Sequence, residues 1–347
     1  MGARLINHLF VLIAICMFGS CSSEDNDLGN NGRDGQSGDT VEIVATNLEV
    51  PWEIDFLPDG AMIFTERTGA VKLLRNGSQE TVGTFEVASE SEAGLLGLAV
   101  DPDFSSTKRI YMYYTYRSAQ GMLNRVSVFT LNSTLEDEQI LIDSIEGEVF
   151  HDGGRIEFGP DGLVYITTGD AGVPERSQDT SSLNGKILRM NPDGTIPQDN
   201  PFGNYVYALG IRNSEGVDWY DDTMYAVDHG PQRHDEVNII ERGENYGWPR
   251  TCDDYPAYRC YTDFTLAPAD IVATDTFLYV SGLRGNQIRR INRNTGEQQA
   301  LFTGYGRIRP LTIHEGYLYF GTSNRDGRGN PASDDDKIVR VPLSELR

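Results

Sequence analysis

The stretch PDGLVYITTGD (residues 160–170) holds the pattern that decides the fold: a turn of proline, aspartate and glycine, followed by a short strand of aliphatic and aromatic residues. This combination is typical of antiparallel β-structure. In a more general form, a turn carrying Asp, Gly or Lys followed by a strand of alternating aromatic and aliphatic residues, the pattern recurs about 40 to 60 residues apart. The six copies are PDGAMIFTE (58–66), STKRIYMYYT (106–115), PDGLVYITTGD (160–170), DDTMYAVDHG (221–230), DTFLYVSGLRG (275–285) and HEGYLYFGTS (314–323).

These repeats predict an all-β fold, a six-bladed β-propeller of four-stranded antiparallel blades. A period near fifty with several strands per unit is typical of that architecture. The ring has to close, and only the strands VEIVATNL (41–48) and DDKIVRVPL (335–343) remain at the two ends. We therefore expect these N- and C-terminal strands to share the last blade. A β-sandwich, or two β-domains, does not explain six evenly spaced copies.

The first 40 residues are predicted to lie outside the propeller domain, which spans residues 41–347. Residues 1–21 have a basic start, an apolar run and small residues before Cys21, which indicates a secretory signal. The ending FGSC favours a lipoprotein signal with Cys21 as the lipidated cysteine, although an ordinary cleaved signal is the alternative. Residues 22–40 read as a disordered polar tether. We expect an extracytoplasmic protein, a cell-surface or periplasmic lipoprotein, that meets the membrane only through this lipid anchor.

Cysteine content and charge bound the function further. In an oxidising compartment, Cys252 and Cys260 are expected to form a disulfide that closes a short loop. The formal net charge of −23 argues against a nucleic-acid partner, because phosphate binding needs clustered positive charge.

His151 and Asp170 lie at the two ends of one predicted hairpin. Neighbouring antiparallel strands bring such positions together, and a histidine held by a carboxylate suits a general base. The alternative is a loop histidine with an unrelated turn aspartate.

Four arginines lie in loops next to inner strands. The planar, fork-shaped guanidinium group of arginine binds carboxylates in bidentate fashion. Salt-bridged surface arginines are the alternative. The segment 228–249 is rich in oxygen ligands, as calcium sites are. The arginines are Arg212, Arg284, Arg307 and Arg309.

Nine stretches, in order from about residue 48 to 341, resemble the soluble pyrroloquinoline-quinone (PQQ) dependent glucose/sorbosone dehydrogenases, and within them the aldose sugar dehydrogenases. Any one stretch would be weak, but nine in order are specific. They are PWEIDFLPDGAMIFTERTGAVKLL (51–74), EAGLLGLAVDPDF (92–104), HDGGRIEFGPDGLVYITTGDAG (151–172), SLNGKILRMNPDGTIPQDNPF (182–202), YALGIRNSEGVDW (207–219), HGPQRHDEVNII (229–240), NYGWP (245–249), GRIRP (306–310) and TSNRDGRGNP (322–331).

The resemblance implies oxidation of aldose sugars at C1 to the lactone, with hydride transfer to PQQ, Ca²⁺ as a second cofactor, and a further electron acceptor as partner. It implies these roles for residues of this chain: His151 as general base, Asp170 as the acid that orients it, Arg212 and Asn213 at the quinone carbonyls, Glu92, Arg284, Arg307 and Arg309 at the cofactor, Gly230 and Pro231 as carbonyl donors to the bridging calcium, and Glu236 and Tyr246 at a second calcium.

Two positions depart from the family pattern. Glu92 stands where relatives usually have glutamine, and a carboxylate there repels the carboxylates of PQQ unless it is protonated or paired with arginine. Arg284 stands where relatives usually have lysine. A propeller without cofactor, acting as an extracellular binding module, is the alternative. A calcium-dependent lactone hydrolase would centre its metal on carboxylates and asparagines rather than arginines.

Overall fold

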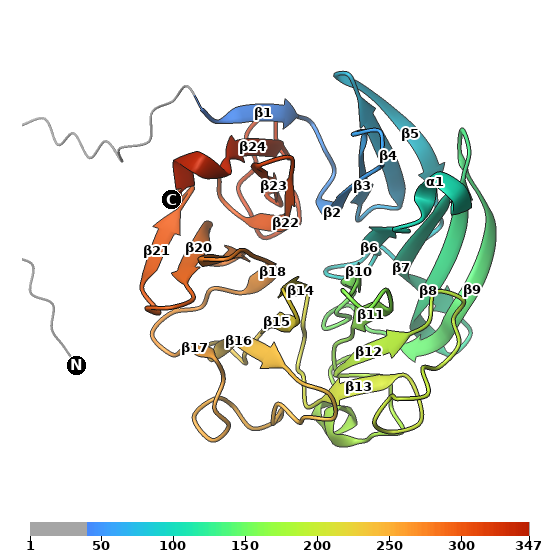
Figure 1. Cartoon of the computed structure of the whole chain (residues 1–347), viewed down its shortest axis with the longest axis vertical. Helices are drawn as coiled ribbons and strands as arrows, with labels where there is room; N and C mark the ends of the chain where they lie inside the picture. The colour runs from blue at the N-terminus through green and yellow to red at the C-terminus, as the bar shows by residue number, and fades with distance from the viewer. Residues whose placement is uncertain (1–39, 347) are drawn as a thin grey trace, which may run out of the picture. The chain divides into compact units, whose positions relative to one another are not determined.

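The computed structural model describes residues 40–346, and these form six four-stranded antiparallel sheets arranged as the blades of a propeller (Figure 1). In blades 1 to 5 the strands follow one another in chain order from the centre outward, whereas the outermost strand of blade 6 comes from the N-terminal side of the chain. Blades 1 to 3 contain β2 (Pro51–Phe56), β3 (Met62–Glu66), β4 (Ala70–Arg75) and β5 (Ser78–Thr84); β6 (Leu95–Val100), β7 (Arg109–Ser118), β8 (Gly121–Leu131) and β9 (Leu135–Glu146); and β10 (Ile156–Phe158), β11 (Val164–Thr167), β12 (Lys186–Met190) and β13 (Val206–Leu209).

The remaining blades repeat this plan. Blades 4 and 5 contain β14 (Gly216–Tyr220), β15 (Thr223–Asp228), β16 (Asp235–Ile240) and β17 (Arg259–Tyr261); and β18 (Pro268–Ala273), β19 (Phe277–Gly282), β20 (Gln287–Asn292) and β21 (Gln298–Leu301). Blade 6 contains β22 (Ile308–His314), β23 (Tyr317–Thr322), β24 (Ile338–Pro342) and β1 (Glu42–Ala45). The short helices are α1 (Phe104–Thr107), η1 (Pro174–Gln178) and η2 (Leu343–Leu346).

Blade 6 closes the ring as the sequence predicts. Its outermost strand, β1, comes from the N-terminal side and pairs with β24, with Glu42 opposite Arg340 and Ile43 opposite Val339. The Arg340 guanidinium also contacts the Glu42 carboxylate at 2.7 Å. The expected sharing of the last blade between the two terminal strands is therefore confirmed.

The repeated sequence pattern forms the second strand of each blade. All four residues of β11 are buried, as are all five residues of β3. A strand in this position has sheet neighbours on both sides and packs against adjacent blades on both faces, so nearly every residue in it is apolar. This explains why the repeat is visible in the sequence.

Aspartates on innermost strands tie neighbouring blades together. Asp218, on β14, accepts the main-chain N–H of Trp219 at 2.7 Å and that of Ala273, in blade 5, at 2.7 Å. Asp55 on β2 and Asp270 on β18 bond the innermost strand of the next blade in the same way. Each carboxylate thus satisfies an N–H group that the blade plan leaves unpaired.

The centre of the ring is filled by a buried ionic cluster. Arg155, just before β10, pairs with Glu53 of β2 and, at 2.9 Å, with Asp270 of β18. Its guanidinium lies over the ring of Trp52, 4.8 Å from the ring centroid. These contacts join blades 1, 3 and 5, so the innermost strands form a rigid base for the loops at their ends.

Three further expectations concern the cysteines, the membrane and the N-terminal segment. The expected disulfide between Cys252 and Cys260 is present, with the two Cα atoms 6.2 Å apart. Within residues 40–346, no helix is long and apolar enough to cross a membrane. The predicted signal, the lipidated Cys21 and the tether up to residue 39 lie outside the described residues.

Candidate active site

His151 and Asp170 meet as the sequence predicts. Nδ1 of His151 lies 2.8 Å from Oδ1 of Asp170. Asp170 is almost fully buried, whereas the His151 side chain keeps 17% of its surface exposed. An ionised carboxylate can only accept a hydrogen bond, so it fixes the proton on Nδ1. Nε2 of a neutral His151 is then left with its lone pair available.

Close packing of two loops brings this pair together. His151 has a φ of +63°, in the left-handed region, and its carbonyl accepts the N–H of Ala171 at 3.1 Å. A Cβ atom on Gly169 would lie 1.9 Å from that carbonyl oxygen, so only glycine allows the approach. The glycine before Asp170 in the TGD sequence is therefore needed to form the pair.

Asp170 has two further donors. Trp248 Nε1 donates to Oδ2 at 2.8 Å, and the Gly172 N–H donates to Oδ1 at 2.8 Å. Burial raises the pKa of Asp170, but the hydrogen bonds from His151, Gly172 and Trp248 outweigh it and hold the pKa below its ordinary value. The carboxylate therefore stays charged beside the imidazole.

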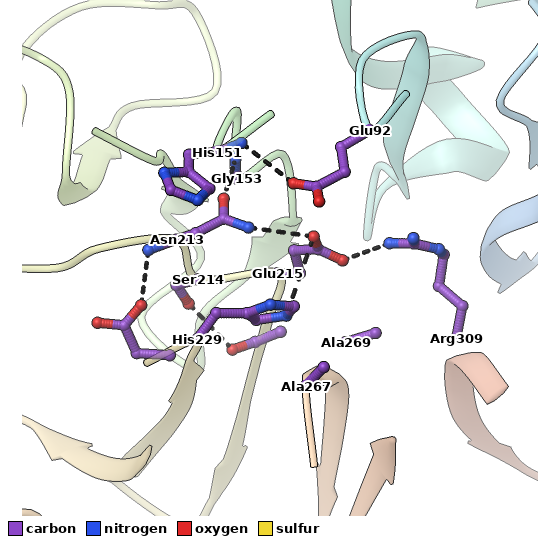
Figure 2. A network of polar contacts seen from close by, with 12 residues as sticks. Glu92, His151, Gly153, Asn213, Ser214, Glu215, His229, Ala267, Ala269 and Arg309 are labelled. Atoms are coloured by element: carbon purple, nitrogen blue, oxygen red, sulfur yellow. Dashed lines mark hydrogen bonds and ion pairs between the residues drawn. The ribbon is translucent and has the colours of Figure 1, made fainter. Parts of the chain in front are cut away.

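Glu215 joins several predicted residues into one network, although sequence reasoning did not select it (Figure 2). Its Oε2 pairs with Arg309, its Oε1 accepts Nδ2 of Asn213 at 3.2 Å, and the same oxygen lies 4.0 Å from Nε2 of His229. Asn213 in turn accepts the Gly153 N–H at 2.9 Å through Oδ1. The network links the arginines to the loop that carries His151.

Arg212 and Asn213 form a tight turn held by Asp228. The two carboxylate oxygens of Asp228 accept the N–H groups of Arg212 at 2.8 Å and of Asn213 at 2.7 Å. The guanidinium of Arg212 lies 5.2 Å from the ring centroid of Trp248 and donates to the carbonyl of His229 at 3.2 Å. Arg212 therefore shares Trp248 with the His151–Asp170 pair.

Two further arginines, Arg307 and Arg309, are buried beside this network. Arg307 pairs with Asp326 at 2.6 Å and donates to the Leu283 carbonyl, whereas Arg309 pairs with Glu215. Arg67, which sequence reasoning missed, joins them: burial and the neighbouring Arg309 lower its pKa to about 10.

Several buried nitrogens in this group have no hydrogen-bond partner in the protein. Among residues 40–346, these include Nε of Arg67, Arg212 and Arg309, together with Nε2 of His229. A buried polar group without a partner is costly, and cations crowded together favour an anion between them. The arrangement is therefore suited to a ligand with several acidic groups.

Arg284 has a different environment from the other predicted arginines. It is exposed at the β19–β20 turn and lines a cavity of about 700 Å³ together with Arg307, Arg328 and Lys337. The cavity opens between loops of blades 5 and 6, beside the buried arginines. Of the four arginines predicted together, Arg284 therefore reaches the site from its edge.

The four residues predicted to hold calcium line one small cavity. They share it with Arg212, Asp228 and Trp248, so the cavity adjoins the His151–Asp170 pair. The hydroxyl of Tyr246 donates to the carbonyl of Ile239 at 2.7 Å and accepts the N–H of Glu241 at 2.8 Å, so it is already engaged in two hydrogen bonds. Burial and the nearby Asp228 raise the pKa of Glu236 to about 8. The four residues are Gly230, Pro231, Glu236 and Tyr246.

This cavity is not a dense acidic cluster. Within residues 40–346, no group of three or more His, Cys, Asp and Glu side chains is arranged to hold a metal ion. Two buried carboxyl groups of raised pKa, those of Asp228 and Glu236, line it, and oxygen ligands of this kind are the ones that a hard cation such as Ca²⁺ prefers.

Two of the residues that sequence reasoning did not select, Arg67 and His229, share a position that the repeats do reveal. Arg67 directly follows β3 and His229 directly follows β15, while Asp170 comes three positions after the end of β11. The second strand of every blade ends at the same face of the ring, so polar residues after each copy of the repeat gather at one site. Glu215 carries no such signal, because it precedes an innermost strand.

Fold and site together define a propeller whose central loops hold a histidine–aspartate pair beside a cluster of arginines. Residues 48–338 match the family described as Glucose / Sorbosone dehydrogenase. The chain therefore belongs to this family.

Known relatives agree with this assignment. The chain is 32% identical over 324 residues to quinoprotein glucose dehydrogenase B of Acinetobacter calcoaceticus, covering 80% of this chain and 66% of that protein. It is 30% identical over 231 residues to aldose sugar dehydrogenase YliI of Escherichia coli, covering 60% and 61%. The PQQ-bound aldose sugar dehydrogenase of Streptomyces coelicolor superimposes with a TM-score of 0.79 at 33% identity, covering 87% and 98%.

Proposed function

We propose that this chain is a PQQ-dependent aldose dehydrogenase that oxidises sugars at C1 to the lactone. The observation that carries the proposal is the His151–Asp170 pair, which lies beside buried arginine nitrogens without partners. A base alone would suit many reactions. A base next to a site for a polyanion suits a cofactor that carries several carboxylates.

The residues present fit PQQ. Arg67, Arg307 and Arg309 would supply positive charge for its carboxylates, and Arg212 and Asn213, whose N–H groups Asp228 holds, would contact its carbonyl oxygens. Arg284 approaches from the edge. When bound, PQQ supplies an ortho-quinone that accepts hydride from the substrate.

His151 performs the proton step. Nε2 accepts the proton of the sugar C1 hydroxyl, and the ionised Asp170 stabilises the imidazolium that results. Trp248 keeps the carboxylate oriented through its N–H. The exposed part of the His151 ring would face the sugar, whereas Nδ1 faces the buried Asp170.

Calcium is the second proposed cofactor. Main-chain oxygens of Gly230 and Pro231, with Glu236 and Tyr246, would hold Ca²⁺ in the cavity next to Arg212. There it would polarise the carbonyl groups of the cofactor. Calcium is expected to raise the melting temperature of the apoprotein, and Glu236→Gln is expected to remove most of that increase.

Reconstitution tests the function directly. Apoprotein is mixed with PQQ and Ca²⁺ and assayed for reduction of a redox dye with a panel of aldoses. We expect sugar-dependent reduction that needs both additions and that Mg²⁺ restores poorly, because its small octahedral shell suits carbonyl-rich sites badly. Absence of PQQ binding in a fluorescence titration would instead favour a binding module without cofactor.

We further propose that the protein is exported and anchored by a lipid on Cys21, and that an electron acceptor outside the cytoplasm reoxidises it. The Cys252–Cys260 disulfide supports an oxidising compartment. Metabolic labelling with a radioactive fatty acid should mark the wild type, and Cys21→Ser should abolish the label. A labelled Cys21→Ser variant would contradict the anchor.

A further inference from the structure

Glu92 uses both of its carboxylate oxygens. Oε2 accepts the main-chain N–H of His151 at 3.1 Å (Figure 2), and Oε1 pairs with Nη1 of Arg328 at 2.7 Å. Arg328 also donates from Nη2 to the hydroxyl of Ser91 at 2.8 Å. The Glu92 side chain is 16% exposed, so water screens it only in part. The carboxylate is therefore held in place against the loop that carries His151.

The pair bridges two blades that are separated by blade 1. Glu92 lies in the turn before β6, in blade 2, whereas Arg328 lies in the loop between β23 and β24, in blade 6. The main-chain N–H of Arg328 donates to Oδ1 of Asp326 at 2.9 Å. Oδ2 of Asp326 accepts a hydrogen bond from Nε of Arg307 at 2.7 Å. One continuous polar path thus connects His151 to Arg307.

The path also balances charge. Burial raises the pKa of Glu92, but His229, Arg328 and the His151 N–H outweigh it and lower the pKa to about 2. An ionised carboxylate at this position repels an anionic ligand at the arginines. The guanidinium of Arg328 offsets that charge, which a neutral glutamine would not require.

We propose that Glu92 and Arg328 form a clamp that positions His151 and couples its loop to the arginines of the cofactor site, so that Glu92 is a positioning residue. The proposal rests on the proposed function for the identity of the ligand. In this proposal, Arg328 neutralises the negative charge of Glu92, so that the site can still bind a polyanion.

Three variants test the charge balance by PQQ titration of the apoprotein. Arg328→Ala leaves Glu92 charged and unpaired, so the dissociation constant of PQQ should rise roughly tenfold or more. Glu92→Gln combined with Arg328→Ala should restore it to within about threefold of wild type, because no net charge remains. Unchanged affinity in Arg328→Ala, or no recovery in the double variant, would overturn the clamp.

Turnover separates positioning from binding. Glu92→Gln keeps an oxygen for the His151 N–H and should retain kcat within about threefold. Glu92→Ala loses that oxygen and should lower kcat by roughly tenfold at saturating PQQ, without weaker PQQ binding. Arg117→Ala is the matched control, because it removes an arginine from a surface pair with Glu90, a near neighbour of Glu92.

Hydrogen exchange tests the positioning without any cofactor. In the apoprotein, amide exchange over residues 149–153 should accelerate in Glu92→Ala and stay close to wild type in Glu92→Gln. If the wild type bound no PQQ, the proposed function would fall, and this measurement would still decide whether Glu92 holds the His151 loop. Equal exchange in wild type and Glu92→Ala would refute the positioning role.

Discussion

The imidazole of His151 bonds Asp170 and not the arginines, which makes its contribution separable from theirs. His151→Ala removes the base but leaves Arg307, Arg309 and Arg67 in place. We expect PQQ affinity within about threefold of wild type and a fall in kcat of about 10² to 10⁴-fold, the usual contribution of a positioned base. PQQ titration and sugar-dependent dye reduction measure the two quantities. Wild-type turnover in this variant would remove His151 from the mechanism.

Asp170→Asn should be milder, because the hydrogen bonds around this residue decide how an amide would sit. Oδ1 accepts two donors, His151 and Gly172, whereas Oδ2 accepts only Trp248. The amide oxygen is therefore expected at the Oδ1 position, which preserves the proton on Nδ1 of His151. Only the negative charge is lost, and we expect kcat to fall by roughly 10 to 10²-fold.

The same geometry provides a control for Asp170→Asn. Its amide N–H₂ then faces the N–H of Trp248, two donors against each other. Adding Trp248→Phe removes that conflict and should recover stability, measured by thermal unfolding, without recovering kcat. A loss of kcat in Asp170→Asn equal to that in His151→Ala would show that the tautomer has changed.

Sequence reasoning reached some residues of the site and not others for a physical reason. His151 and Asp170 stand at the ends of one hairpin, and antiparallel pairing alone brings such ends together. Glu215 and Arg328 reach the site through contacts between blades 4 and 6 and between blades 6 and 2. Contacts of that kind depend on how the ring closes, which no local pattern records.

At the scale of the strand, the repeat was readable because each second strand is buried on both faces. Outer strands are less so: β5 and β21 are largely exposed and carry no strong pattern. The number of blades and the closing strands could therefore be predicted, while the limits of the outer strands could not. Register also escaped prediction, because bulges such as the one between Ile308 and Leu311 shift it locally.

The bonds between innermost strands make a prediction at this scale. Asp218→Ala leaves the part-buried N–H of Ala273 without the carboxylate that accepts it, so the free energy of unfolding should fall by about 1 to 3 kcal/mol. Asp222→Ala, in the exposed turn of the same blade, is the control and should change it by less than about 0.5 kcal/mol. Denaturant unfolding compares the two. Equal stability of both variants would show that this bond does not hold blades 4 and 5 together.

Across the whole molecule, buried carboxyl groups predict how stability depends on pH. Burial raises the pKa of Asp55 and Asp218 to about 6 and that of Asp152 to about 7. A folded-state pKa above the unfolded value of about 3.9 means that the folded protein binds more protons. This contribution to stability is complete below about pH 4 and is lost as the pH rises through 6 to 7.

The apoprotein should therefore melt at a higher temperature at pH 5 than at pH 8. Scans at both pH values in a chelating buffer check the sign. Asp55→Asn should reduce the difference, because it removes one of the titrating groups while keeping an oxygen for the Val100 N–H. A melting temperature that rises steadily from pH 5 to pH 8 would contradict this account.

The pairing of β1 with β24 means that the ring has no structural starting point. Glu42 and Arg340 are 298 positions apart in the chain and yet are neighbours in one sheet. Consider a circular permutant in which a short linker joins η2 to β1 and the chain opens at the turn between β14 and β15. The blade that is shared by the two terminal strands would then be blade 4 instead of blade 6. Because every loop of the site keeps its place, such a chain should fold with the same circular dichroism spectrum and the same affinity for PQQ.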